Sequence, residues 1–181
     1  MDNQLIRSLP SKILAFLIVA FLSALVVIGV RGALASSEAT VTQTLGWVEK
    51  TTITGVNRAL KAKLDTGATT TSINAEVLEK PDEEVESGGT VKFYFVDTDG
   101  NKTLFERPLV RWVKIKGGSK RPVVQMQFCL AGKTIEGEVS LAERDEFNYA
   151  VLIGRNVLKK GQFAVDSRDS FVASRACDER G

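Results

Sequence analysis

Short apolar or alternating segments follow one another along most of the chain, and turn-forming residues separate them. Alternation of apolar and polar residues predicts a half-buried β-strand, and Gly, Asn, Asp or Ser between such runs predicts a turn. On this basis, strands are expected over residues 47–53, 59–64, 91–96, 102–106, 109–116, 123–130, 134–141 and 162–166. Short strands separated by turns are typical of an all-β sandwich or barrel.

Two segments interrupt the strand pattern. Residues 74–80 predict a short helix, with Ala75, Val77 and Leu78 as its apolar positions. Residues 81–89 are acidic and end in two glycines, which predicts a solvated surface loop.

Two hairpin turns are expected between neighbouring strands. Asp99 and Gly100 stand between two β-rich runs, and Asp-Gly in that position is a strong hairpin signal. Residues 97–100 look like an Asp-Thr-Gly turn, but the additional Asp99 breaks the match. Gly117 and Gly118 mark the tip of a second, longer hairpin.

The strand over residues 59–64 leads directly into Asp65-Thr66-Gly67. An Asp at the end of a strand, held in a tight turn, presents its carboxylate to a cleft. Thr66 can buttress the turn by a local hydrogen bond, and Gly67 can supply a conformation that other residues resist. The tripeptide alone is equally compatible with an ordinary β-turn.

A second segment strengthens the interpretation of the Asp65 turn as a functional site. Residues 150–153 are apolar without alternation, which predicts a strand buried on both faces. Gly154 then predicts a turn, and Arg155 and Asn156 begin a short helix.

Taken together, residues 64–68 (Leu-Asp-Thr-Gly-Ala) and 152–158 (Leu-Ile-Gly-Arg-Asn-Val-Leu) resemble the two signatures of retropepsin-like aspartic peptidases. More narrowly, the chain resembles the bacterial members once labelled ATP-dependent zinc proteases. The resemblance covers residues 46–166, and its supporting segments are 46–49, 73–75, 121–124 and 163–166.

The resemblance implies a retropepsin-like acid-protease β-barrel with one short helix after the Gly-Arg-Asn turn. It implies that Asp65 is catalytic, that Thr66 and Gly67 fix its carboxylate, and that Ala68 lines the floor of the site. The structural turn beneath the site is then residues 153–156, namely Ile153, Gly154, Arg155 and Asn156.

One such Asp per chain implies a homodimer, in which Asp65 of each subunit supplies half of a carboxylate dyad that acts on a protein or peptide substrate. Retroviral members close a Gly-rich flap over the substrate. The hairpin tip at Gly117 and Gly118 is the candidate flap here, although its flanking charges are unlike those of a retroviral flap.

The chain departs from the retroviral pattern after Asp-Thr-Gly-Ala. Retroviral enzymes usually continue with an Asp that pairs with the Arg of the Gly-Arg-Asn turn, and Thr69 stands in that place. A buried Arg155 therefore needs another carboxylate, because an unpaired buried charge is costly. Glu49 is the candidate; the alternative is a surface-exposed Arg155.

The N-terminal part is unlike the rest of the chain. Residues 13–30 carry no charge and are flanked by Lys12 and Arg31, so they can almost span a bilayer as a helix. The Ala33-Leu34-Ala35 segment also matches a signal-peptidase site. An uncleaved inner-membrane anchor and a signal peptide cleaved near Ala35 both stay open, and a buried soluble helix is a third alternative.

The position of basic residues before this span predicts that the following domain is exported to the periplasm. The expected layout is a signal peptide or anchor (1–35), a linker (36–45), a retropepsin-like domain (46–173) and a polar tail (174–181). In an oxidising compartment Cys129 and Cys177 can pair, and two unpaired thiols are the open alternative.

Composition excludes several other chemistries. The chain has no histidine, which removes Ser-His and Cys-His nucleophiles and the commonest partner of Cys in zinc sites. It contains no phosphate-binding Gly-x-x-x-x-Gly-Lys-Ser/Thr loop, so neither a metal nor a cofactor is expected. Outside residues 1–35 the basic and acidic residues balance, and no nucleic-acid partner is expected.

The sequence thus favours an exported aspartic endopeptidase. A non-catalytic binding or regulatory domain with the same fold is the main alternative. A metal-dependent hydrolase is a third reading, which the lack of histidine opposes.

Overall fold

The computed structural model describes residues 42–115, 117–143 and 148–173. Within these ranges no helix is long and apolar enough to cross a membrane. The predicted membrane-spanning or signal segment, residues 13–30, lies outside the described residues.

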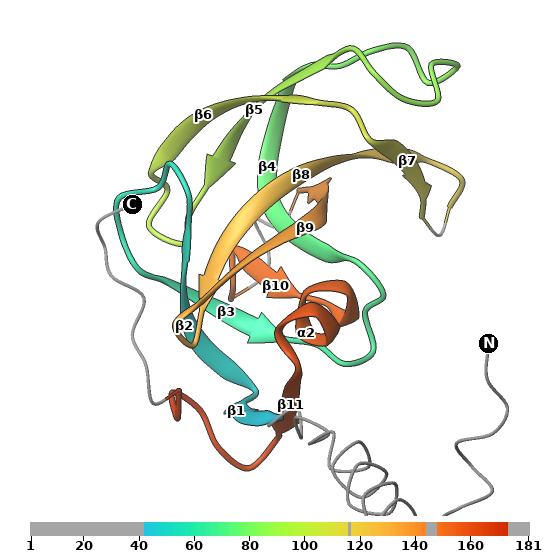
Figure 1. Cartoon of the computed structure of the whole chain (residues 1–181). Coiled ribbons are helices and arrows are strands. Elements are labelled where there is room, and N and C mark those ends of the chain that lie inside the picture. The colour runs from blue at the N-terminus through green and yellow to red at the C-terminus, as the bar shows by residue number, and fades with distance from the viewer. Residues whose placement is uncertain (1–41, 116, 144–147, 174–181) are drawn as a thin grey trace, which may run out of the picture. The chain divides into compact units, whose positions relative to one another are not determined.

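The described part of the chain is built from short strands and one short helix (Figure 1). Its elements are β1 (Gln43–Gly46), β2 (Val48–Ile53), β3 (Leu60–Leu64), β4 (Thr71–Glu79), β5 (Thr90–Val96), β6 (Lys102–Pro108), β7 (Arg111–Lys114), β8 (Lys120–Leu130), β9 (Lys133–Ala142), β10 (Val151–Ile153), α2 (Arg155–Gly161) and β11 (Phe163–Asp166). The predicted all-β class with a short helix after the Gly-Arg-Asn turn is therefore confirmed.

Six strands close into a barrel in the order β10, β3, β2, β8, β9 and β4. The closure depends on β10, which pairs in parallel with β3 on one side and antiparallel with β4 on the other. Val151 is opposite Ala62 in the first pairing and opposite Ile73 in the second. All three side chains are buried, as predicted for a strand covered on both faces.

The hydrophobic core is built from side chains that alternate between buried and exposed positions along the long strands. Along β8, the buried residues Met126, Phe128 and Leu130 alternate with more exposed neighbours. Each such side chain contributes roughly 1.5–3 kcal/mol by leaving water.

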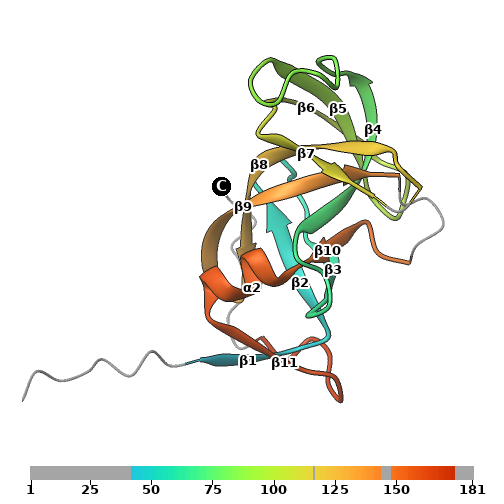
Figure 2. The same cartoon turned by 90° about the vertical axis from the view of Figure 1, so that its right-hand side faces the viewer.

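Two further hairpins extend the barrel sheet. β5 pairs antiparallel with the second half of β4 and with β6, and β7 pairs antiparallel with the start of β8. Figures 1 and 2 show the β5–β6 hairpin continuing from β4 away from the end of the barrel at which β1 and β11 lie.

The two ends of the described domain meet in a separate sheet. β1 and β11 pair in parallel, from Gln43 opposite Phe163 to Gly46 opposite Asp166. The first strand therefore begins at Gln43, within the segment that was expected to be a linker.

The predicted helix over residues 74–80 is wrong, because residues 74–79 belong to β4. Ile73 and Ala75 are buried on one face, and the backbone of β4 pairs with β10 and β9 through its first half and with β5 through its second. Pairing along both edges of the strand outweighs the helical spacing of the apolar residues.

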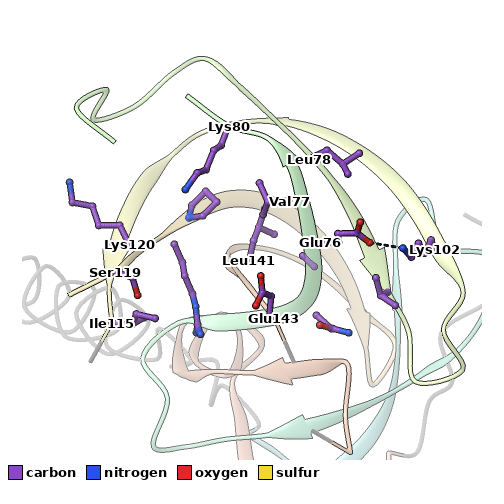
Figure 3. Close-up of a pocket in the computed structure, with 15 residues that line it drawn as sticks. Glu76, Val77, Leu78, Lys80, Lys102, Ile115, Ser119, Lys120, Leu141 and Glu143 are labelled. Atoms are coloured by element: carbon purple, nitrogen blue, oxygen red, sulfur yellow. Dashed lines mark hydrogen bonds and ion pairs between the residues drawn. The ribbon is translucent and has the colours of Figure 1, made fainter. Parts of the chain in front are cut away.

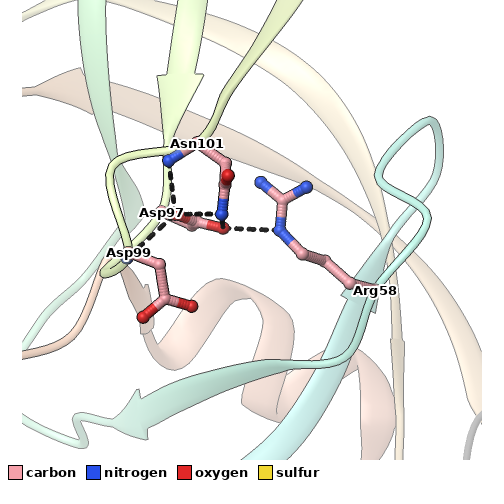
Figure 4. Close-up of polar contacts among 4 residues, drawn as sticks. All are labelled: Arg58, Asp97, Asp99 and Asn101. Atoms are coloured by element: carbon pink, nitrogen blue, oxygen red, sulfur yellow. Dashed lines mark hydrogen bonds and ion pairs between the residues drawn. The ribbon is translucent and has the colours of Figure 1, made fainter.

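The predicted hairpin at residues 97–101 is confirmed, and its organising residue is Asp97. The Asp97 carboxylate accepts hydrogen bonds from the backbone N–H groups of Asp99 and Asn101 and from the side-chain amide of Asn101. It also pairs with the guanidinium of Arg58, which precedes β3 (Figure 4). The buried carboxylate thus joins the β5–β6 turn to the segment that leads into β3.

The hydrogen bonds control the ionisation of this carboxylate. Burial by itself raises the pKa of Asp97, but the hydrogen bonds from Asn101, Asp99 and Arg58 together lower the pKa below the ordinary 3.8. The folded protein therefore favours the charged form of Asp97.

We expect Asp97→Asn to lower the free energy of unfolding by about 2 kcal/mol at neutral pH, because an amide cannot replace a carboxylate that accepts several N–H groups. A pKa that is lower in the folded state stabilises the protein above the unfolded value of 3.8. That contribution is lost as the pH falls through the lower folded pKa. Urea unfolding at neutral pH and at about pH 3 measures both effects.

Asp99→Asn is the matched control. Asp99 is exposed in the same turn, so its change should stay within about 0.5 kcal/mol. An equal loss for both variants would contradict the role assigned to Asp97.

Candidate active site

Asp65 directly follows β3, a central strand of the barrel. The strand lies between β2 and β10, and the Asp65 amide donates to the Ile153 carbonyl at 2.8 Å. The two predicted signature segments are therefore adjacent in space, as expected from the resemblance.

The two oxygens of the Asp65 carboxylate have different surroundings. Oδ1 accepts the backbone N–H groups of Gly67 at 2.9 Å and Ala68 at 3.2 Å. Oδ2 lies 3.6 Å from the Lys63 ammonium nitrogen, and 28% of the Asp65 side chain is exposed. The turn thus fixes one oxygen and leaves the carboxylate accessible to a reactant.

Gly67 fixes the Asp65 carboxylate through its backbone amide, as the resemblance implied, but it does not supply the predicted unusual turn conformation. Gly67 does not have a positive φ; instead, a side-chain carbon at this position would lie 3.2 Å from Asp65 Oδ1. A glycine therefore lets the backbone approach the carboxylate closely.

The expected hydroxyl support from Thr66 is not present within the described part of the chain. Thr66 is exposed, and the bonds to the Asp65 carboxylate from the turn come from backbone amides.

The segment predicted to support the turn does so through its backbone. A side-chain carbon at Gly154 would lie 2.7 Å from the Thr70 carbonyl carbon, so glycine allows β10 to end directly against the turn. From there the Arg155 amide donates to the Ala68 carbonyl at 2.8 Å and the Asn156 amide to the Thr69 carbonyl at 3.3 Å.

Asn156 ties three elements together. Its Oδ1 accepts both the backbone N–H and the hydroxyl of Thr71 at 2.9 Å, while its Nδ2 donates to the Glu138 carbonyl of β9 at 2.8 Å. The Thr71 hydroxyl oxygen in turn accepts the Gly154 amide at 3.0 Å. The sequence interpretation missed Thr71, whose position shortly after Asp-Thr-Gly was its only local signal.

The prediction that Glu49 pairs with Arg155 is wrong. The Arg155 side chain is exposed and donates to the Thr69 hydroxyl at 2.9 Å and to the Thr66 carbonyl at 3.3 Å. Because water also solvates the guanidinium, no buried carboxylate is needed, and the alternative of an exposed Arg155 is confirmed.

Glu49 has another function in the fold. It is 1% exposed, and its carboxylate accepts the backbone N–H groups of Gly46, Val172 and Ala173 at 2.8–3.3 Å. It therefore holds the segment after β11 against the start of β2.

Comparison with known proteins agrees with this geometry. The family model of the retropepsin-like aspartic endopeptidase RimB matches residues 44–176. The chain belongs to the RimB-like family of retropepsin-like aspartic endopeptidases.

Solved structures include a relative of this RimB-like chain. Protein Lpg0085 of Legionella pneumophila subsp. pneumophila str. Philadelphia 1, of unknown function (DUF785), is 32% identical, with a TM-score of 0.64. The match covers 74% of this chain and 100% of the relative. The protease of simian foamy virus (mac) matches at 20% identity and a TM-score of 0.35, over 62% and 91% of the two chains. A search of curated proteins found no match.

The candidate flap of the RimB-like chain is a tight turn between β7 and β8. Gly117 and Gly118 have φ values of +99° and +91°, which glycine adopts readily. The turn is closed by a hydrogen bond from the Ile115 amide to the Ser119 carbonyl.

Ile115 and Ser119 also line a cavity of about 720 Å³ between this hairpin and β4 (Figure 3). Its charged lining includes Lys80, Lys120 and Arg121, and Glu76 pairs with Lys102 at its edge. Asp65 is not among the residues that line this cavity. The structure therefore places the candidate flap beside a cavity that Asp65 does not line.

Two other predicted features concern cysteine and metal chemistry. Cys129 of β8 is disulfide-bonded, and Cys177, the other cysteine of the sequence, lies outside the described residues. Within residues 42–115, 117–143 and 148–173, no three His, Cys, Asp or Glu side chains are arranged to hold a metal ion.

Proposed function

We propose that the protein is an exported aspartic endopeptidase whose active site is a dyad of Asp65 carboxylates from two identical subunits. The observation that carries the proposal is the Asp65 carboxylate itself, with one oxygen fixed by two backbone amides and with the side chain 28% exposed. The two family signatures lie in contact around it.

Two carboxylates at contact distance can supply both the general base and the general acid that peptide hydrolysis needs. Like charges at that distance do not both ionise readily, so the pair retains one proton over a range of pH. The ionised Asp65 takes a proton from the attacking water, and the protonated Asp65 donates a hydrogen bond to the carbonyl oxygen of the scissile bond. No metal or cofactor takes part in this scheme.

The second carboxylate comes from a second chain in this proposal. The chain contains one Asp-Thr-Gly turn, because the similar segment at residues 97–100 forms the β5–β6 hairpin around the buried Asp97. A two-fold axis places identical turns face to face. The substrate is a protein or peptide that lies across both subunits.

The location proposed for this site is the periplasm. The basic residues before the apolar segment 13–30 favour export of everything that follows. The segment attaches the enzyme to the inner membrane if it is retained, and the domain is released if cleavage occurs near Ala35.

The first test replaces the proposed general base. Full-length Asp65→Asn keeps the size of the side chain but cannot ionise, so hydrolysis of a peptide library should fall by at least about 10²–10⁴-fold. Asp99→Asn is the control, since Asp99 lies in the β5–β6 turn and should leave activity unchanged. An active Asp65→Asn protein would rule out the dyad. Inactivity of the wild type at every pH would favour the non-catalytic alternative.

A second test asks whether both carboxylates are required. Wild-type and Asp65→Asn chains with different tags are co-expressed, and the mixed dimer is isolated by two affinity steps. The mixed dimer should lose at least about 10²-fold in activity, because one ionisable Asp65 cannot supply both halves of the dyad. Half of the wild-type activity would show that each chain works alone.

Export is tested by a reporter fused after Gly181. A reporter that is active only in an oxidising exported compartment should be active in the fusion to the full chain. Deletion of residues 1–35 should abolish that activity. Activity of a cytoplasm-dependent reporter in the full-length fusion would contradict the proposed location.

A further inference from the structure

The acidic loop between β4 and β5, residues 81–89, has a defined conformation although its side chains are exposed. Residues 82–89 are exposed, as predicted for a solvated loop. Gly89 has a φ of +73°, and a side-chain carbon there would lie 2.8 Å from Pro81 Cγ. Glycine therefore lets the two ends of the loop meet, as in a compact Ω-type loop.

The end of this acidic loop is joined by backbone hydrogen bonds to the residues just before β7. The Gly88 amide donates to the Leu109 carbonyl at 2.8 Å, and the Leu109 amide donates to the Gly89 carbonyl at 3.0 Å. These bonds continue the pairing of β5 with β6 beyond Thr90 and Pro108. The acidic loop and the start of β7 are thereby held side by side.

The middle of the acidic loop contacts both strands of the β7–β8 hairpin. The indole Nε1 of Trp112 on β7 donates to the Val85 carbonyl at 2.8 Å. The ammonium group of Lys120, at the start of β8, donates to the Glu83 carbonyl at 3.1 Å. Both acceptors are backbone carbonyls, so these contacts depend on the conformation of the loop more than on its acidic side chains.

The ion pairs of the acidic loop contribute less than these hydrogen bonds. The Glu83 carboxylate lies 3.7 Å from the Lys80 ammonium and 4.0 Å from the Lys120 ammonium, and the three side chains are 40–48% exposed. Pairs of this kind stabilise little, because water and salt screen them. Trp112 also packs against the hydrophobic core, and the Lys80 ammonium lies 5.4 Å from the centre of its ring. Trp112 is therefore the main contact between the hairpin and the loop.

The neighbouring residue on β7 contacts the turn that follows Asp65. The Arg111 guanidinium pairs with the Glu138 carboxylate of β9 at 2.7 Å and reaches the Thr70 hydroxyl at 3.4 Å. Successive side chains of a strand leave opposite faces. β7 thus connects the acidic loop, through Trp112, with the segment after Asp65, through Arg111.

The β7–β8 hairpin needs support from outside its own two strands. β7 has four residues and pairs with β8, and with no other strand of the described part of the chain. A two-stranded hairpin is marginally stable by itself in water. The position of β7 therefore depends on the contacts made by Trp112 and Arg111.

We propose that residues 81–89 form a brace that fixes the β7–β8 hairpin beside the Asp65 turn. Trp112 is the contact to the brace, and Arg111 is a positioning residue that ties the braced strand to the turn. The brace itself follows from contacts within one chain and does not require peptide hydrolysis. Its consequence rests on the proposed function: in the peptidase this hairpin is the candidate flap, so the brace limits how far the flap moves away from Asp65.

The decisive variant is Trp112→Phe in the full-length protein. It removes the indole donor but keeps an aromatic ring against the core and Lys80. Loss of one hydrogen bond shifts a local opening equilibrium by about two- to tenfold. Hydrogen exchange followed by NMR should therefore become about two- to tenfold faster at the amides of residues 111–114 and at the Arg111 Nε–H, which donates to Glu138.

The same spectra contain an internal reference. Arg58 also donates its Nε–H to a carboxylate, that of Asp97, at the β5–β6 turn. Its exchange rate should not change in Trp112→Phe. Trp47→Phe is the matched control, because it removes the other tryptophan of the chain, whose ring packs edge-on against Tyr149. It should leave exchange at β7 and Arg111 unchanged.

A second pair of variants leaves the core untouched. Lys120→Met removes the bond to the Glu83 carbonyl and should speed exchange at β7 by about two- to fivefold. Lys114→Met removes the same charge from the position opposite Lys120 in the hairpin. Lys114 is exposed, and within the described residues its ammonium group has no hydrogen bond or ion pair. This control should leave exchange at β7 unchanged.

The effect on the candidate flap is measured by peptide hydrolysis. Trp112→Phe should raise KM by about two- to tenfold with kcat nearly unchanged, because the substrate has to order a hairpin that the brace no longer orders beforehand. A lower kcat with an unchanged KM, or no change in either, would overturn the control of the flap by the brace.

The exchange measurements decide the brace separately from the peptidase. Unchanged exchange at β7 in Trp112→Phe, or the same acceleration in Trp47→Phe or Lys114→Met, would overturn the brace. Equal acceleration at Arg58 would show general destabilisation and would also overturn it. Faster exchange at β7 with an unchanged Arg111 would overturn the positioning role of Arg111. Because no substrate is used, an inactive wild type would defeat the proposed function and the effect on the flap but leave the brace supported.

Discussion

The candidate site depends on how closely β10 and the start of α2 approach the turn that follows Asp65. A side-chain carbon at Gly154 would lie 2.7 Å from the Thr70 carbonyl carbon, so a larger residue would separate the two segments. With glycine there, the first two amides of α2 reach two carbonyls of the turn, and a carboxamide from α2 holds the first residue of β4. Backbone contacts thus orient the carboxylate.

β4 starts at this contact and runs away from the candidate site. β4 closes the barrel through its first half and carries the β5–β6 hairpin on its second half. Residues 74–78 of β4 line the cavity beside the β7–β8 turn. The Asp65 turn and the cavity are therefore connected by one strand, while the buried Asp97 joins the hairpin back to the residues before β3.

Thr69 stands where the retroviral pattern has an Asp, and its hydroxyl joins the turn to α2. A hydroxyl oxygen accepts the Arg155 guanidinium where retroviral enzymes use a carboxylate, and the guanidinium stays exposed, so it needs no buried counter-charge. The loss of that negative charge leaves Lys63 and Arg155 as cations near Asp65. The charged side chains next to the Asp65 turn are thus cationic.

The sequence by itself determined the features that depend on near neighbours: the alternating strands, the hairpin at Asp97, the Asp65 turn and the glycine at position 154. Only the tertiary structure decided that residues 74–79 form a strand, because pairing with three other strands outweighs a local helical spacing. It also decided the partners of Glu49 and Arg155. Those partners depend on which distant backbone amides and hydroxyls the closed barrel brings within hydrogen-bonding distance, and local sequence patterns carry no record of such long-range distances.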